Sequence, residues 1–288
     1  MHDDARRAPN VSGIWVQPPE LTPAALQPRP RYYLPAAVAD LSLPYSKKVA
    51  PENADEAPAL QIRNNIAEIL NKAPEGITLA QRSNFIPPTA WVYEDAWRKK
   101  SIGWLSGEAF SFDDERALLL DWLAPANGEL LLDIGCSSGF YARSLQQAAP
   151  EAAVAAIDFS RPMLQDARKR ARAEGRRLYL LQADAQALPF AAQSAEGLAC
   201  GGSLNEFARP EIALKEARRV IKPGGRFFMM HLLEAKTSPG RWLQKSAETG
   251  GLHFWSKKAS EALFEKTGFR MVKEKSLGMV MFSLLEPA

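Results

Sequence analysis

The stretch "ELLLDIGCSSGFYARSL", residues 129–145, constrains the fold more than any other part of the chain. An apolar run over Leu130–Ile134 leads into a turn that holds Gly135 and Gly139, and a helical pattern follows. A buried strand that passes through a glycine turn into a helix is typical of an open parallel sheet, where ligands bind at the carboxyl ends of the strands. The stretch therefore predicts a ligand site at this turn.

The rest of the C-terminal two-thirds alternates short apolar runs with amphipathic helices, which indicates βαβ units. The last two runs, separated by Gly278, predict an antiparallel hairpin. We therefore expect an α/β fold, a Rossmann-like doubly wound sheet that is mostly parallel with a C-terminal antiparallel hairpin, plus an N-terminal helical extension. The predicted strands are Leu130–Ile134, Ala153–Ile157, Leu178–Gln182, Gly197–Cys200, Arg226–His231, Met271–Lys275 and Met279–Leu284, and the predicted helices are Asp114–Leu123, Phe140–Ala148, Ser160 to Gly175, Pro210–Ile221 and Ser256 to Gly268.

The N-terminal part divides into two segments before a domain at residues 113–288. Residues 1–60 are rich in proline, which blocks helices, but they also carry aromatic side chains. This composition predicts an irregular arm packed on the core. Residues 61–112 predict a helical cap, because apolar residues recur on one helical face and an aromatic stretch follows. The residues concerned are Ile62, Ile66, Ile69, Leu70, Trp91, Trp97 and Trp104.

Charge and composition exclude several classes of function. The formal net charge is +3, with 36 basic and 33 acidic residues mixed along the chain, which argues against a nucleic-acid partner. The only cysteines, Cys136 and Cys200, fit neither a disulfide framework nor a four-ligand zinc site, so we expect no metal and a cytoplasmic protein. We expect neither a signal peptide nor a membrane span. A monomer and a homodimer both remain open.

Acidic residues follow the next two predicted strands. Asp158 stands at a strand end, where a carboxylate can accept both hydroxyl hydrogens of a ribose, and Asp184 stands where a short polar side chain can contact an adenine edge. The turn itself has the spacing Gly135-x-x-x-Gly139 and not the G-x-G-x-x-G of a dinucleotide site. Each residue alone fits an ordinary turn, cap or loop. Their joint placement at three strand ends favours a nucleoside-containing ligand.

Five segments in this order resemble the class I S-adenosylmethionine-dependent methyltransferases, in particular the branch that methylates small molecules: "LLDIGCSSG", "AIDFSRPML", "ADAQALPF", "ARRVIKPGGRFFM" and "SKKASEALFEKTGF". The resemblance implies S-adenosyl-L-methionine as cofactor. It places Asp133, Gly135, Cys136 and Gly139 around the methionine part, Asp158 on the ribose, Phe159 and Met163 beside the adenine, and Asp184 with Ala185 at the adenine edge. Ser137, which stands where the family's commoner loop has glycine, and Gly201 complete the predicted cofactor site.

Methyl transfer from a sulfonium is an in-line displacement, so the protein must mainly position the reactants and exclude water. A base helps where the nucleophile is an oxygen or an acidic carbon. The candidates at the carboxyl edge are Glu206 and His231, although a solvated acid and a core histidine are equally ordinary interpretations. In the family, the segment before the first strand forms a wall of the acceptor pocket, which predicts pocket roles for Tyr93, Trp97 and Arg98.

These observations predict an enzyme, a methyltransferase of a small aromatic or lipid-like acceptor such as a quinone or phenol. The alternatives are a non-catalytic cofactor-binding module and a methyltransferase of RNA or protein, although "CGGSLNEF" lacks the Asn/Asp-Pro-Pro-aromatic signature of many nitrogen-directed enzymes. Two segments are candidate lids over the site. One is residues 85–112, for which a dimer contact is the alternative, and the other is residues 234–255, which carry Trp242, His253 and Trp255.

Overall fold

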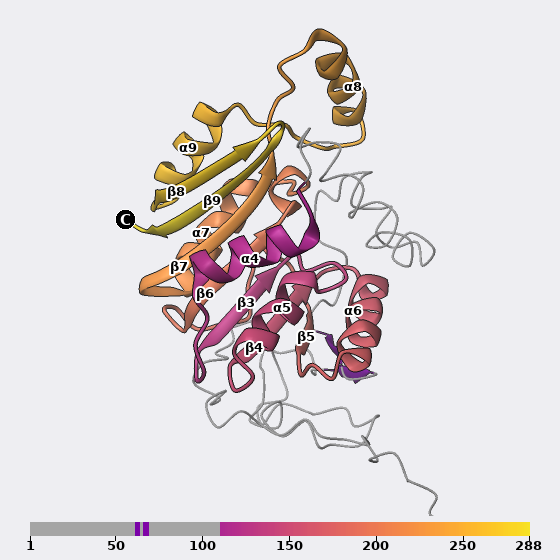
Figure 1. The fold of residues 1–288 in the computed structure, drawn as a ribbon, viewed down its shortest axis with the longest axis vertical. Coiled ribbons are helices and arrows are strands. Elements are labelled where there is room, and N and C mark those ends of the chain that lie inside the picture. Colours follow the sequence, from indigo (N-terminus) through magenta and orange to yellow (C-terminus); the bar gives the residue numbers. More distant parts are fainter. Residues whose placement is uncertain (1–60, 64–65, 69–109) are drawn as a thin grey trace, which may run out of the picture.

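The computed structural model describes residues 61–63, 66–68 and 110–288. Their strands form one nine-stranded sheet in the order β1-β2-β5-β4-β3-β6-β7-β9-β8 (Figure 1). The central strands are parallel, and β9 pairs antiparallel with both β7 and β8. The strands are β1 (Gln61–Arg63), β2 (Ile66–Glu68), β3 (Leu130–Ile134), β4 (Ala153–Asp158), β5 (Tyr179–Gln182), β6 (Ala195–Gly201), β7 (Ile221–Leu232), β8 (Phe269–Leu277) and β9 (Val280–Pro287).

Helices cover both faces of this sheet. The helices α4 (Phe112–Leu123), α5 (Phe140–Ala148) and α6 (Arg161–Ala173) supply one hydrophobic cluster, whereas α7 (Pro210–Val220) and α9 (Lys257–Lys266) supply the other. Successive residues of β3 alternate between the clusters, with Leu131 in the first and Leu130 and Leu132 in the second. A strand that is buried on both faces has to be apolar throughout, which explains the unbroken run in the sequence.

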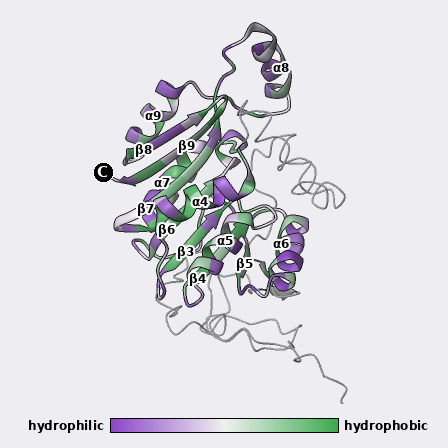
Figure 2. Cartoon of the chain, viewed as in Figure 1, coloured by the Kyte–Doolittle hydropathy of each residue, from purple (hydrophilic) through white to green (hydrophobic). Residues whose placement is uncertain are grey.

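The strand order reverses beside β3. The chain steps from β3 to β4 and β5 in one direction, and then returns to β6 and β7 on the other side of β3. The carboxyl ends of β3, β4 and β6 therefore meet around one crevice, which is where open α/β sheets bind ligands. Figure 2 shows that the far edge is different: β9 is mostly hydrophobic, and the edge strand β8 is mostly hydrophilic.

The predicted fold class is confirmed for the α/β core and its C-terminal hairpin. The predicted strands and helices of residues 113–288 are all present, with ends that differ by a few residues; α7, for example, ends at Val220, and β7 begins at Ile221 with an irregular register. A further helix, α8 (Ser238–Glu248), was not predicted. Thr237 caps it by accepting a hydrogen bond from the amide of Gly240.

The prediction of a helix that begins near Ile62 is wrong. Ile62 lies in β1 and Ile66 in β2, and these two short strands form an antiparallel pair. Strand β2 also pairs in parallel with β5, and this pairing buries Ile66 completely. The branched side chains of isoleucine favour a strand. Pairing with the edge of the sheet at β5 is therefore preferred here over the helix that the spacing of the apolar residues predicts. The proline-rich arm, the rest of the predicted cap, and its residues Ile69, Leu70, Trp91, Trp97 and Trp104 lie outside the described residues.

Candidate functional site

The turn after β3 requires a glycine at position 135. Gly135 has a φ of 69°, in the left-handed region that side chains disfavour. A Cβ at this position would lie 2.3 Å from Oγ of Ser203, whose hydroxyl donates a 3.1 Å hydrogen bond to the carbonyl of Gly135. The glycine therefore allows the loop after β6 to approach the turn after β3.

Asp158, the last residue of β4, is bound to the same turn. Its carboxylate accepts a 2.8 Å hydrogen bond from the amide of Ser137 and a 2.7 Å hydrogen bond from the amide of Ser160. The side chain is buried, and burial raises the pKa of Asp158 to about 6 in spite of these hydrogen bonds. The carboxyl group is therefore fixed in place and titrates near neutral pH.

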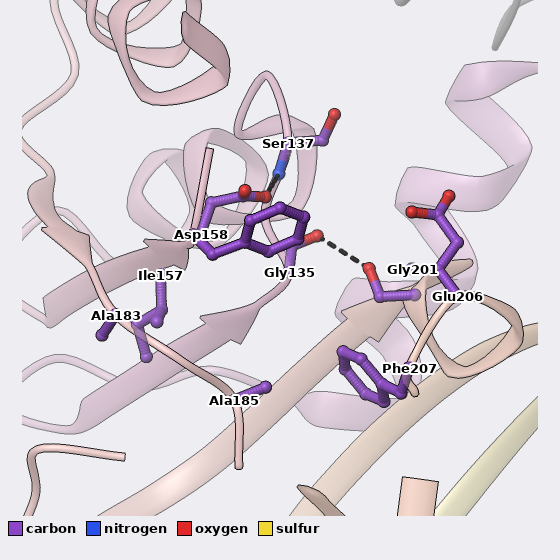
Figure 3. Close-up of a pocket in the computed structure, with 11 residues that line it drawn as sticks. Gly135, Ser137, Ile157, Asp158, Ala183, Ala185, Gly201, Glu206 and Phe207 are labelled. Carbon is purple, nitrogen blue, oxygen red and sulfur yellow. Dashed lines mark hydrogen bonds between the residues drawn. The ribbon is translucent and has the colours of Figure 1, made fainter. Parts of the chain in front are cut away.

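A hollow of about 490 Å³, counted with its open mouth, lies at these strand ends (Figure 3). In the close-up, Asp158 and Ile157 lie on one side, and Glu206 and Phe207 lie on the other. Two glycines, Gly135 and Gly201, form part of the wall. The lining residues are Gly135, Ser137, Ile157, Asp158, Phe159, Ala183, Ala185, Gly201, Ser203, Glu206 and Phe207.

The predicted cofactor residues separate into two groups in this geometry. Gly135, Ser137, Asp158, Phe159, Ala185 and Gly201 line the hollow. The predicted residues Asp133, Cys136, Gly139, Met163 and Asp184 are not part of its lining.

Three residues of the second group support the wall from behind. Asp133 is buried and accepts a 2.9 Å hydrogen bond from the amide of Ala142 in α5. The sulfur of Met163 accepts a 3.4 Å hydrogen bond from the hydroxyl of Ser137. Asp184 accepts a 2.8 Å hydrogen bond from the amide of Gln186, and this bond orders the loop between Ala183 and Ala185. These residues hold the turn, α6 and the loop in place.

Four lining residues were not predicted: Ile157, Ala183, Ser203 and Phe207. Ile157 and Ala183 directly precede predicted residues, so a search along the chain from Asp158 and Asp184 would have found them. Ser203 and Phe207 lie on the loop after β6, which passes through the short helix η3 (Ser203–Asn205). The close contact between Ser203 and Gly135 depends on the packing of two distant segments.

The two candidate bases lie in different environments. Glu206 lines the hollow, as a base for an acceptor would have to. His231 is fully buried in β7, with its ring edge-on to Phe264 of α9 at a centroid distance of 5.8 Å. Burial lowers the pKa of His231 to about 4, and neither ring nitrogen has a hydrogen-bond partner among the residues that the structure describes. This placement fits the core interpretation of His231 and favours Glu206 as the base.

Only some of the aromatic residues in the two predicted lids belong to the residues that the structure describes. Tyr93, Trp97 and Arg98, the predicted pocket residues, lie outside the described residues together with most of residues 85–112. In the second segment, Trp242 on α8 is 72% exposed, whereas Trp255 is buried in the core, edge-on to His253 at a centroid distance of 4.1 Å. Trp255 therefore anchors this segment, and Trp242 faces outward.

Across residues 61–63, 66–68 and 110–288, no helix is long and apolar enough to cross a membrane. Within the same ranges, histidine, cysteine and acidic side chains form no group of three or more that could hold a metal ion.

Residues 132–229, which contain the turn after β3, Asp158 and the loop after β6, match the family model described as "Methyltransferase domain". Among solved structures, a methyltransferase that depends on S-adenosylmethionine, from Aquifex aeolicus, superposes with a TM-score of 0.55 at 18% identity and covers 71% of this chain and 100% of its own. The mitomycin 7-O-methyltransferase MmcR superposes with a TM-score of 0.58 at 17% identity, covering 74% of this chain and 62% of its own. These similarities show the fold.

Curated relatives match over a shorter length. The ubiquinone/menaquinone biosynthesis C-methyltransferase UbiE of Paracoccus denitrificans is 36% identical over 130 residues, which is 44% of this chain and 52% of the relative. The demethylmenaquinone methyltransferase of Thermus thermophilus is 39% identical over 100 residues, which is 35% of this chain and 46% of the relative. The chain thus spans about half the length of the curated relatives it matches. Residues 132–229 thus match a methyltransferase domain, and the fold around them is shared with solved methyltransferase structures.

Proposed function

We propose that this protein transfers a methyl group from S-adenosylmethionine to a small quinone-type acceptor. The observation that carries the proposal is the placement of Asp158, which is bound to the turn after β3 and lines the hollow at the strand ends. The relatives named for ubiquinone, menaquinone and demethylmenaquinone methylation support the choice of acceptor.

The residues around the hollow fit the nucleoside of this cofactor. The carboxylate of Asp158 lines the hollow and is oriented by hydrogen bonds from backbone amides, so its oxygens would accept hydrogen bonds from a ribose diol. The side chain of Phe159 and the loop of Ala183 to Ala185 line the neighbouring wall and would enclose the adenine. Gly135, which also lines the hollow, would lie beside the methionine part.

When bound, S-adenosylmethionine supplies a methyl group that is activated by the positive charge on its sulfur. The chain has to hold the acceptor in line with this methyl group and keep water out. Glu206 and Phe207 lie on the far side of the hollow from Asp158, so we assign the acceptor to this side. The Glu206 carboxylate would accept the proton that a quinol hydroxyl or ring carbon gives up.

The proposed partner is therefore a small molecule, and the proposed compartment is the cytoplasm. Both cysteines are free and buried, which agrees with a reducing environment. A homodimer remains compatible with this function, as does a monomer.

Transfer of a labelled methyl group tests the proposal. The full chain is incubated with methyl-labelled S-adenosylmethionine and a panel of reduced naphthoquinones and benzoquinones, phenols, amines, fatty acids and RNA, and products are identified by mass spectrometry. We expect a methylated product from a quinol and almost none from Glu206→Gln, which retains the shape of the side chain but cannot take a proton. Methylation of RNA, or cofactor binding without any product, would favour the two alternatives instead.

A further inference from the structure

Asn205, in the loop after β6, is buried and holds the end of β7. It is 2% exposed. Its amide oxygen accepts a 2.8 Å hydrogen bond from the amide of Leu232, and its amide nitrogen donates a 2.9 Å hydrogen bond to the carbonyl of the same residue. The side chain thus imitates a neighbouring strand and fixes the last residue of β7.

The same side chain also holds a distant segment. Its amide nitrogen donates a second hydrogen bond, of 2.6 Å, to the carbonyl of His253, and the backbone carbonyl of Asn205 accepts a 2.7 Å hydrogen bond from the amide of His253. Both hydrogens of the side-chain amide are therefore used. An asparagine that satisfies two carbonyls and one amide cannot be replaced by aspartate without loss of both donors.

These contacts close a long excursion of the chain. The backbone leaves the sheet after Leu232, forms α8, and returns at His253, so both ends of residues 233–252 are bound to one side chain. A hydrogen bond of 2.9 Å from the amide of Glu234 to the carbonyl of Trp255 joins the two ends of this excursion a second time. In Figure 1, α8 projects away from the sheet, beyond the point where the two ends of the excursion meet.

The next two residues after Asn205 are on the acceptor side of the hollow. Glu206 and Phe207 line it, whereas Asn205 lies behind them and is not part of the lining. Any shift of Asn205 moves the backbone of both lining residues. The position of residues 233–252 and the position of the acceptor wall are therefore set by the same buried side chain.

We infer that Asn205 is a positioning residue that couples the excursion of residues 233–252 to the acceptor wall at Glu206 and Phe207. The inference rests on the proposed function for its acceptor, but the coupling itself is a property of the fold. Occupation of the acceptor side then orders the excursion, and loosening of the excursion weakens acceptor binding without affecting the nucleoside side around Asp158.

The test compares Asn205→Asp and Asn205→Ala with Asn127→Asp and Asn127→Ala. Asn127 is an exposed asparagine that accepts a 3.0 Å hydrogen bond from the amide of Glu151, and it precedes β3, at the opposite end of this strand from the hollow. Three quantities are measured on the full chain: hydrogen exchange of residues 203–207 and 233–255, the Kd of S-adenosylhomocysteine, and kcat and KM with reduced 1,4-naphthoquinone as the probe.

In both Asn205 variants, we expect the amide hydrogens of residues 203–207 and of residues 233–255 to exchange about tenfold faster or more, while those of the central strands stay protected. The acceptor KM should rise about tenfold, with the Kd of S-adenosylhomocysteine within about threefold of the unchanged chain. The Asn127 variants should behave as the unchanged chain does.

Unchanged exchange in residues 233–255, or faster exchange there without faster exchange in residues 203–207, would overturn the coupling. So would equal loss of protection throughout the sheet, or loss of the fold in both variants, because Asn205 would then be only a stabilising residue. Failure of the unchanged chain to bind S-adenosylhomocysteine counts against the proposed function, and the exchange result still decides the coupling.

Discussion

The carboxylate of Asp158 accepts a 2.8 Å hydrogen bond from the backbone amide of Ser137. This bond joins the end of β4 to the turn after β3, at the point where the strand order reverses. The turn therefore has a fixed shape before any ligand binds, and the acid that would receive a ribose is oriented by the loop that would receive the methionine part. Such preorganisation reduces the ordering that binding requires.

Ser137 adopts the conformation that a glycine would adopt more easily. Its φ is 51°, in the left-handed region, which costs a residue with a side chain about 1 kcal/mol or more. We expect Ser137→Gly to raise the free energy of unfolding by about 0.5 to 1 kcal/mol, measured by urea denaturation. Ser137→Ala keeps the strain and serves as the control, with no gain expected. A less stable glycine variant would contradict this interpretation of the turn.

Cofactor affinity should depend on the ionisation of Asp158. Burial raises its pKa to about 6 in the free protein, and only the ionised form can accept both ribose hydroxyls. Binding therefore favours the ionised state, and the affinity for S-adenosylhomocysteine should be constant above pH 7 and fall by up to tenfold per pH unit below about 6. Titration calorimetry between pH 5 and 8 measures this dependence. Asp158→Asn should bind weakly with little pH dependence, and an equal dependence in that variant would assign the titration to another group.

Gly135→Ala should damage the site through one identifiable clash. The added Cβ would lie 2.3 Å from Oγ and 2.7 Å from Cβ of Ser203, so the turn and the loop after β6 would have to separate. We expect at least a tenfold loss of affinity for S-adenosylhomocysteine. Adding Ser203→Gly removes both clashing atoms and should restore part of the affinity, although the strain of a φ of 69° remains. Additive losses in the double variant would show that this contact is not the cause.

The burial of His231 should lower the free energy of unfolding in acid. Burial lowers its pKa to about 4, below that of the unfolded chain, so its contribution to stability is complete above pH 6.5 and is lost as the pH falls toward 4. The loss reaches about 3 kcal/mol. The ring of His231→Phe fills similar space beside Phe264 and cannot take up a proton. Between pH 7.5 and 4.5, the free energy of unfolding measured in urea should therefore fall by about 2 to 3 kcal/mol less in this variant than in the unchanged protein.

Turnover of the same variant separates the two interpretations of His231. A core residue outside the lining of the hollow leaves kcat within about threefold when it is replaced by an aromatic ring of similar size. A loss of kcat by about a hundredfold at unchanged stability would restore His231 as the base.

The sequence predicts the core of the fold well because its strands are buried on both faces and its helices are amphipathic. Leu130–Ile134 and Phe140–Ala148 match the structure residue for residue. The prediction is wrong at Ile62 and Ile66, since three-residue strands are too short to show a period and form only because β5 offers an edge. Ser203 was missed for a similar reason, because its contact with Gly135 joins segments that are 68 residues apart.

Calorimetric titration of the full chain with S-adenosylhomocysteine at pH 7.5 measures whether the hollow at the strand ends binds this cofactor. We expect one saturable site in the unchanged protein and an affinity at least tenfold lower for Asp158→Ala. NADH should not compete, because the turn lacks the glycine pattern of a dinucleotide site. Glu129→Ala, at the opposite end of β3, should bind as the unchanged protein does. Absence of binding by the unchanged protein, or equal binding by Asp158→Ala, would contradict the account.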